Sequence, residues 1–247
     1  MSIYPQLLWG MSIVKRVLDL VFASVGLVLF GWLIFLFGLI VWMQDFRNPL
    51  FIAKRVGQFG NVFKMIKLRS MVVDAQSSGV SSTAGDDPRI TTIGKLIRRF
   101  KIDELPQLIN VLKGEMSLVG PRPNVESEVR LYTSHERGLL LVRPGITDFS
   151  SIIFSDEADI LYGQSDPDLV YSKLIRPWKS RLGIFYIEHQ NIGIDLFIVF
   201  LTVCNSVNRE WTLQKLAKLL TVLGASQDLI EVSLRRSPLS QMKMLSN

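Results

Sequence analysis

The feature that most constrains the fold is a run of residues without any charge, from Leu20 to Met43. It is 24 residues long, and a helix needs about 20 apolar residues to cross the hydrocarbon core of a bilayer. A secretory signal peptide is disfavoured, because the run is too long and no small-residue cleavage site follows it. We therefore expect an N-terminal membrane segment, with a single spanning helix as its simplest form.

Positive charges on both sides of this run argue against a straight spanning helix. Lys15 and Arg16 precede the run, and Arg47 follows it. Cytoplasmic flanks of membrane segments carry an excess of Lys and Arg, so both ends have a cytoplasmic signature. A helix that enters and returns through one leaflet satisfies both flanks, and we predict such a re-entrant anchor over residues 1–47. Asp19 is expected near the lipid interface, where a charge costs less than in the hydrocarbon.

Composition limits the architecture and the partners. A chain of 247 residues can bury one core, or one core and a membrane segment. The hydrophobic fraction is 48%, and the mean hydropathy of +0.29 is high for a soluble domain. The net charge of +6 favours a negatively charged partner, whether nucleic acid, anionic lipid head groups or a phosphorylated substrate. The single cysteine, Cys204, excludes an internal disulfide, and the two histidines show no zinc-binding spacing.

The remaining patterns predict an α+β fold that is mainly helical, with a small β-hairpin or sheet. Alternating residues from Phe51 to Met71 predict the hairpin. A stretch rich in Ser, Gly and Asp at 74–92 predicts a loop, and helical spacing resumes at Ile93. A further helix is expected at about 125–140, with His135 on its surface.

The C-terminal third is expected to form amphipathic helices. Residues 168–190 mix basic and aromatic residues, which favours a helix at the lipid interface. The alternative is a helix packed on the core with solvated cations. Residues 192–207 are apolar but too short to span, so we expect them along the membrane surface. Two short helices and a basic tail with Arg235 and Arg236 follow Trp211. The predicted units are an anchor at 1–47, a catalytic core at 48–165, and interfacial helices with the tail at 166–247.

Two adjacent carboxylates, Asp103 and Glu104, lie within a distinctive stretch from Gly94 to Pro123. Apolar residues at helical spacing follow this pair and predict a helix that begins near Asp103. Carboxylates at a helix N-terminus with arginines close by form a suitable place for a divalent cation and phosphates. The alternative is an ordinary N-cap at Asp103 with a favourable first-turn charge at Glu104. The cations just before the pair are Arg98, Arg99 and Lys101, and the apolar positions are Leu105, Leu108, Ile109 and Leu112.

The segment KIDELPQLINVLKGEMSLVGPRP, residues 101–123, resembles the signature of the bacterial sugar transferases. These are the monotopic phosphoglycosyl transferases that start the assembly of lipid-linked glycans. The segment IAKRVGQFGNVFKMIKLRSM lies before it and VRPGIT after it, and the resemblance covers residues 13–148. It implies a re-entrant anchor, although Gly31 stands where relatives usually carry a proline.

The resemblance implies transfer of a sugar-1-phosphate from a UDP-sugar to polyprenyl (undecaprenyl) phosphate. Asp103 would attack the phosphorus that bears the sugar, expel UMP and carry the phosphosugar until the lipid phosphate attacks it. Glu104, together with Asp103, would hold Mg²⁺. Arg98 would clamp a phosphate in a bidentate fork, and Arg122 would lie near the nucleotide. The product would start an O-antigen, a capsule or an exopolysaccharide, and the sequence does not identify the sugar.

The same resemblance adds Lys67, Arg69 and Arg143 to the predicted phosphate-binding residues, with Glu115 behind the site. It also implies the bacterial inner membrane, with the active site on the cytoplasmic face. A different class stays open: a non-catalytic, membrane-anchored protein that binds acidic lipid or other polyanions. No RNA-binding motif is present, so nucleic acid is not an expected partner. The sequence leaves the oligomeric state open, a homodimer included.

Overall fold

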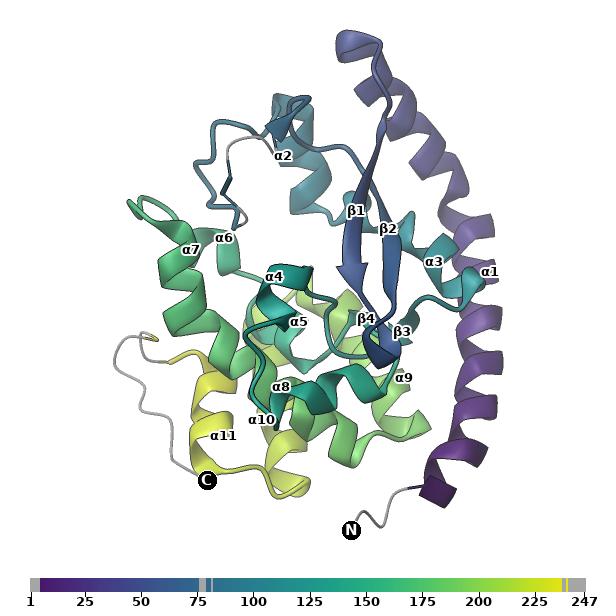
Figure 1. Ribbon diagram of the computed structural model, residues 1–247, viewed down its shortest axis with the longest axis vertical. Coiled ribbons are helices and arrows are strands. Elements are labelled where there is room, and N and C mark those ends of the chain that lie inside the picture. The colour runs from purple at the N-terminus through teal and green to yellow at the C-terminus, as the bar shows by residue number, and fades with distance from the viewer. Residues whose placement is uncertain (1–4, 76–78, 81, 237–238, 240–247) are drawn as a thin grey trace.

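The computed structural model describes residues 5–75, 79–80, 82–236 and 239, with side chains from Ile13 onward. The described part is mainly helical and contains two small two-stranded sheets, which confirms the predicted α+β fold. One long helix, α1, runs along one side of the molecule (Figure 1). The β1–β2 hairpin lies between α1 and most of the shorter helices (Figure 1).

The elements have the following bounds. The helices are α1 (Pro5–Asp45), α2 (Thr92–Arg99), α3 (Gln107–Lys113), α4 (Glu126–Val129), α5 (Phe149–Ile153), α6 (Glu157–Ile160), α7 (Pro167–Val170), α8 (Arg176–His189), α9 (Ile192–Asn205), α10 (Arg209–Val222) and α11 (Gln227–Leu234). The strands are β1 (Leu50–Val56), β2 (Val62–Leu68), β3 (Ser117–Val119) and β4 (Gly145–Thr147). Short tight turns of helix are η1 (Gln58–Gly60), η3 (Ile102–Glu104) and η4 (Glu136–Leu141), and η5 (Tyr171–Ile175) is a π-helical turn.

Helix α1 is one unbroken helix of 41 residues. It passes through Gly31 without a break, so the expected bend in the middle of the segment is absent from α1, and return through one leaflet stays a prediction. A single glycine costs a helix about 1 kcal/mol, against about 3 for proline, and the apolar helix formers around Gly31 outweigh that cost. Among the described residues, one helix is long and apolar enough to cross a membrane, over Ile13–Asp45 with a mean hydropathy of 2.6. By length and composition, α1 is therefore a candidate membrane anchor.

One narrow stripe of α1 packs against the rest of the protein, and the opposite face is exposed. Ala23 and Val41 lie on the stripe and are fully buried. Gly26 allows close approach, because a Cβ atom there would lie 3.0 Å from a methyl group of Leu108. On the outer face, Phe35 is 73% exposed, together with many other large apolar side chains of α1. The anchor therefore lies along the protein instead of projecting from it.

Polar contacts fix the start of α1 against β3. The Lys15 ammonium donates to the Val119 carbonyl at 3.0 Å and pairs with Asp195 at 2.5 Å. One turn further, Asp19 accepts a hydrogen bond from the backbone N–H of Leu118 at 3.0 Å. Asp19 is buried by protein, and this corrects its expected place near the lipid interface. Its cost of burial is offset because its carboxylate is hydrogen-bonded.

The end of α1 is held as firmly as its start. The guanidinium of Arg69, just after β2, makes a two-point contact with the carboxylate of Asp45, with one N–O distance of 2.6 Å. The 41-residue helix thus contacts the same folded body from Lys15 to Asp45.

The β1–β2 hairpin was predicted, and the structure confirms it as an antiparallel pair in which Leu50 faces Leu68. A single buried side chain, Asn110 of α3, ties the hairpin to the helix behind it. Its amide oxygen accepts from the Ile66 N–H at 3.0 Å, and its amide nitrogen donates to the Lys64 carbonyl at 2.7 Å. Because these bonds are made to the backbone of β2, they set the position of the side chains that β2 directs toward α3.

A second sheet fixes the turn that carries Arg122. Strands β3 and β4 are parallel, and their ends meet where Gly120 packs directly against Gly145. A Cβ atom on Gly145 would lie 2.1 Å from the Gly120 nitrogen, so both positions require glycine to let the backbones approach. The Pro-Arg-Pro turn starts at the next residue, Pro121.

The helix predicted at about 125–140 is wrong. The segment instead forms α4 and the separate turn η4. Between them, the Glu136 N–H donates to the Thr133 hydroxyl at 3.2 Å, and the Thr133 N–H donates to the Glu136 carboxylate at 2.9 Å. This reciprocal pair is a capping box, which begins a new helical turn and so ends the previous one.

The aromatic residues expected at a lipid interface in 168–190 lie in the core. Trp178 of α8 is 1% exposed, and Tyr186 is equally buried against Phe149. The cations of α8 pair with acids on neighbouring elements, as Arg181 does with Asp228. Ion pairing and core packing together account for the mixture of basic and aromatic residues, which the sequence pattern had indicated as interfacial. The outer face of α9 does expose apolar side chains, Leu196, Phe200 and Val203, so its expected place along a membrane surface stays a prediction.

The C-terminal helices and the residues before them share one hydrophobic core, which contains Val119 and Phe149 as well as Trp178 and Leu216. Arg235, expected in a basic tail, instead pairs with Asp156 at 2.9 Å. The rest of the expected tail, residues 240–247, lies outside the described residues, as does the start of the anchor unit, residues 1–4.

The close approach of Gly94 to the backbone provides a test of this packing. A Cβ atom on Gly94 would lie 1.8 Å from the Ser70 carbonyl oxygen, whereas one on Gly31 would meet nothing within 4 Å. We expect Gly94→Ala to lower the free energy of unfolding by at least about 1–3 kcal/mol, because a backbone atom cannot move aside easily. Gly31→Ala should leave stability unchanged or raise it by up to about 1 kcal/mol. Thermal unfolding in detergent measures both, and a destabilising Gly31→Ala would indicate a break in α1.

Candidate active site

The carboxylate pair lies in a tight turn between two helices. After α2 the chain turns at Lys101, whose φ of 54° is in the left-handed region. This conformation is uncommon for a residue other than glycine, and such residues are enriched at functional sites. Asp103 and Glu104 then belong to the turn η3, and α3 begins only at Gln107. The helix was expected to begin near Asp103, so its start is corrected by about one turn.

Asp103 is buried, and its carboxylate is left without a hydrogen-bond donor. Its residue is 9% exposed, and no side chain or backbone N–H of the described residues donates to it. Burial raises the pKa of Asp103, the positive charge of Lys67 opposes this rise, and the neighbouring charge of Glu104 adds to it. A buried and unengaged carboxylate is a stronger nucleophile than one held by donors, because no hydrogen bond has to break before it reacts.

Glu104 is held by two cations. Lys67 donates to its Oε1 at 2.8 Å, and Arg122 donates to the same oxygen at 2.5 Å. Burial opposes ionisation of Glu104, but Arg122 and Lys67 outweigh it and hold the pKa well below its ordinary value. Glu104 in turn raises the pKa of Arg122. Glu104 is therefore ionised, and three segments of the chain, β2, η3 and the Pro-Arg-Pro turn, meet at its carboxylate.

The two arginines of α2 are placed differently. Arg98 is half-buried. Burial of Asp103 is the largest effect on the pKa of that carboxyl and raises it, and the positive charge of Arg98 lowers it. Arg99 is exposed, and its guanidinium lies over the ring of Phe100 at 5.8 Å. Of the two, Arg98 is therefore the one in electrostatic contact with the pair.

The other residues predicted for the site make their hydrogen bonds and ion pairs away from Asp103 and Glu104. Arg69 pairs with Asp45 at the end of α1, and Arg143 donates to the Gly114 carbonyl at 3.1 Å. Glu115, expected behind the site, accepts a hydrogen bond from Asn110 at 2.7 Å. The phosphate-binding roles of Arg69 and Arg143 stay predictions.

Two buried amides were missed by sequence reasoning. Asn110 aligns β2 with α3, as described above. Gln107 is 1% exposed, and its amide nitrogen has no hydrogen-bond partner among the described residues. Gln107 follows Asp103 by four residues, a spacing that could have drawn attention to it. A buried amide without a partner calls for an explanation, and a substrate oxygen is one group that it could bind.

The pair has suitable donors for Mg²⁺. Within the described part of the chain, no three His, Cys, Asp or Glu residues gather closely enough to hold a metal ion by themselves. Mg²⁺ often binds through one or two carboxylates, with waters and substrate phosphates as its other ligands. Asp103, whose carboxylate is not engaged, and Glu104 beside it meet that requirement.

Comparisons with known proteins agree with the resemblance. The model of the family described as bacterial sugar transferase matches residues 10–209. The chain is 38% identical over 202 residues to galactosyl transferase CpsE of Streptococcus agalactiae, covering 77% of this chain and 41% of that protein. It is 33% identical over 204 residues to exopolysaccharide production protein ExoY of Rhizobium meliloti, covering 76% and 83%.

A third relative is the UDP-glucose:undecaprenyl-phosphate glucose-1-phosphate transferase of Escherichia coli, 34% identical over 206 residues, covering 81% of this chain and 42% of that protein. The chain therefore spans about two fifths of the length of two of these relatives and most of the third. The matched region contains most of α1, the hairpin, the carboxylate pair and the Pro-Arg-Pro turn. The chain belongs to the bacterial sugar transferase family.

Proposed function

We propose that this protein is a phosphoglycosyl transferase that moves a sugar-1-phosphate from a UDP-sugar to polyprenyl phosphate and releases UMP. The observation that carries the proposal is the buried Asp103, with an unengaged carboxylate, beside a Glu104 held by Lys67 and Arg122. The Escherichia coli relative is named for this kind of transfer to undecaprenyl phosphate, which supports the lipid acceptor. The product would be the first lipid-linked intermediate of a glycan such as an exopolysaccharide, O-antigen or capsule.

The reaction has two displacements at one phosphorus. A carboxylate oxygen of Asp103 attacks the sugar-bearing phosphorus, and the bond to the bridging oxygen breaks so that UMP leaves with that oxygen. A phosphate oxygen of the polyprenyl phosphate then attacks the same phosphorus. The aspartyl phosphate bond breaks, which restores the Asp103 carboxylate and leaves a polyprenyl diphosphate sugar.

Charge neutralisation is the main task of the surrounding residues. Both the nucleophile and the phosphates are anionic, so their approach needs fixed positive charge. Lys67 and Arg122 supply it at Glu104, and Arg98 supplies it on the α2 side of Asp103. Mg²⁺, held by the oxygens of Glu104 and Asp103, would add positive charge at the phosphate oxygens.

We also propose that the protein lies on the cytoplasmic face of the bacterial inner membrane. Helix α1 contacts the same folded body at two distant points, through Lys15 and Asp195 in its N-terminal part and through Asp45 and Arg69 at its C-terminal end. This arrangement supports a helix whose two ends stay on one side of the bilayer. The positive residues flanking α1 favour the cytoplasmic side.

The first test concerns the carboxylate pair. Asp103→Asn should reduce UMP release by at least about 10³-fold, because an amide cannot act as the nucleophile. Glu104→Gln should also lose most activity and weaken the dependence on Mg²⁺. The assay contains undecaprenyl phosphate, Mg²⁺ and each member of a panel of UDP-sugars, which also identifies the donor.

Thermal unfolding shows whether each variant keeps its fold. A folded Asp103→Asn protein with near wild-type turnover would contradict the covalent mechanism. Absence of UMP release across the whole panel, together with binding to acidic vesicles, would favour the non-catalytic alternative.

A second test separates the two arginines of α2. Arg98→Lys keeps the charge but loses the planar fork, so we expect it to raise the KM for the UDP-sugar or lower kcat by about 10-fold or more. Arg99→Lys is the matched control, because Arg99 is exposed. Equal losses in the two variants would show that Arg98 has no special role.

A third test concerns topology. Ile13, in the N-terminal part of α1, and Arg47, just after its C-terminal end, are both exposed and can each be replaced by cysteine in a Cys204→Ser background. Both cysteines, and a Lys64→Cys control on β2, should resist an impermeant thiol reagent in intact spheroplasts and label once the membrane is opened. Labelling of the Ile13→Cys protein alone before lysis would mean that α1 spans the bilayer.

A further inference from the structure

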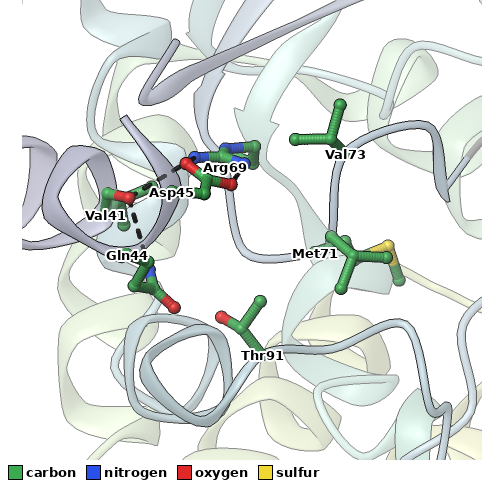
Figure 2. Close-up of a pocket in the computed structure, with 8 residues that line it drawn as sticks. Val41, Gln44, Asp45, Arg69, Met71, Val73 and Thr91 are labelled. Atoms are coloured by element: carbon green, nitrogen blue, oxygen red, sulfur yellow. Dashed lines mark hydrogen bonds and ion pairs between the residues drawn. The ribbon is translucent and has the colours of Figure 1, made fainter. Parts of the chain in front are cut away.

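A cavity of about 340 Å³ lies where α1 ends. It is bounded by the last turns of α1, by the segment after β2 and by Thr91, the N-cap residue of α2. Its walls are apolar except for Gln44, Thr91 and the ion pair of Asp45 with Arg69. Figure 2 shows Arg69 and Asp45 side by side at one edge of the opening, with Thr91 across from them and Met71 and Val73 along another wall. The volume is at the lower end of the range for ligand pockets, about 300–1,000 Å³.

Arg69 is incompletely satisfied in this cavity. Its two terminal nitrogens contact the Asp45 carboxylate, but its Nε is buried and has no hydrogen-bond partner among the described residues. The Arg69 side chain is 10% exposed. Leaving a buried charged donor unpaired is costly, so such a group in a native structure calls for a ligand or another explanation.

Asp45 occupies the two terminal nitrogens of the Arg69 guanidinium, which are the atoms that would bind an oxyanion. A two-point contact with a guanidinium is the geometry that carboxylates and phosphates both adopt. The Asp45 side chain is 35% exposed, so it can turn away into solvent. It also lies at the C-terminal end of α1, where the helix dipole disfavours a negative charge. Asp45 is therefore held there by Arg69, and an anion with more charge can replace it.

The cavity is linked to the carboxylate pair through a short stretch of the chain, residues 67–69. Lys67, which holds Glu104, precedes Arg69 by two residues, and the Arg69 N–H continues the strand pairing by donating to the Pro49 carbonyl at 2.8 Å. Residues two apart on a strand are about 7 Å apart and point to the same side. The backbone of Arg69 therefore lies about one strand step beyond that of Lys67, whose side chain holds Glu104.

We propose that this cavity binds the phosphate head group and the first prenyl unit of the lipid acceptor, with Asp45 as an internal competitor. The assignment rests on the proposed function and names the acceptor subsite of the same reaction. The phosphate binds the guanidinium of Arg69 and displaces Asp45. Val41, Met71 and Val73 contact the first prenyl unit of the lipid. The rest of the chain follows the exposed apolar face of α1 into the lipid.

Competition with Asp45 makes the subsite selective for a phosphate monoester. A monoester carries a charge of about −1.5 to −2 near neutral pH, whereas the phosphodiester of a bilayer phospholipid carries one negative charge, as Asp45 does. Replacing Asp45 by a diester therefore leaves the electrostatic attraction to Arg69 unchanged. Replacing it by a monoester increases that attraction. Bulk phospholipid, present in large excess, is kept out of the site for this reason.

Binding can be measured without any sugar donor. The full-length protein in detergent is dialysed to equilibrium against radiolabelled farnesyl phosphate, with protein-free micelles as the blank. Arg69→Met should weaken binding at least tenfold, and Asp45→Asn should strengthen it at least threefold, because the competitor is gone. Lys54→Met removes an exposed positive charge on β1 and should leave binding unchanged. Farnesol, inorganic phosphate and phosphatidylglycerol should each compete poorly.

Opposite effects of the two substitutions separate a ligand site from a purely structural ion pair. A structural pair predicts that Asp45→Asn and Arg69→Met both destabilise the protein and that neither strengthens binding, and this result would overturn the proposal. Equal competition by phosphatidylglycerol would also overturn it, since the cavity would then hold bulk lipid. If Arg69→Met fails to fold, the gain expected for Asp45→Asn, compared with Asp45→Glu, still decides the matter.

The outcome is independent of the proposed reaction. If no UDP-sugar yields UMP but farnesyl phosphate binds with the expected dependence on Arg69 and Asp45, the reaction is wrong and the lipid phosphate site stands. If UMP is released on addition of polyprenyl phosphate but the binding of farnesyl phosphate does not depend on Arg69 or Asp45, the acceptor binds elsewhere. Only the proposed subsite is then wrong.

Discussion

The arrangement of the candidate active site depends on the neutralisation of one buried carboxylate, that of Glu104. Lys67 reaches it from β2 and Arg122 reaches it from the turn after β3. Removing one partner from a buried ion pair is strongly unfavourable, so the three segments have one stable arrangement. Because Asp103 is the adjacent residue, the same contacts fix the position of its carboxylate and leave its oxygens unengaged. Glu104 thus holds the site together through its ion pairs, while Asp103 beside it keeps a carboxylate that accepts no hydrogen bond from the described residues.

The apolar helix is part of this arrangement and is not a separable tether. Lys15 and Asp19 bind the backbone of β3, and β3 leads within a few residues to Arg122. Any force on the start of α1 is therefore transmitted to the strand that positions the arginine. The same helix ends at Asp45, beside the cavity described above. Attachment to a membrane and the geometry of the active site are coupled through a few polar contacts.

Local patterns predicted the elements that local forces decide. Alternation predicted the β1–β2 hairpin, which the structure confirms. The adjacent carboxylates with a nearby Arg98 indicated the candidate site, and its role stays a prediction. Patterns that depend on neighbours failed. The cations and aromatic rings of α8 suit a lipid surface equally well, and only the packing of Trp178 into the core decides between the two. Thr133 looked like a helical residue until its exchange of hydrogen bonds with Glu136 was seen. Asn110 carried no signal, and the spacing of Gln107 from Asp103 is informative only once the burial of its amide is known.

The stripe of small residues on α1, Ala23 and Gly26, also determines how deep the protein can sit. At about 1.5 Å per residue, α1 is about 60 Å long, twice the hydrocarbon thickness of about 30 Å. A helix held so closely along a folded body meets a bilayer sideways, and its immersion is limited to its own diameter of about 10 Å. It would then widen one leaflet and leave the other unchanged. Such a wedge makes attachment sensitive to the lateral tension and curvature of the leaflet that it enters.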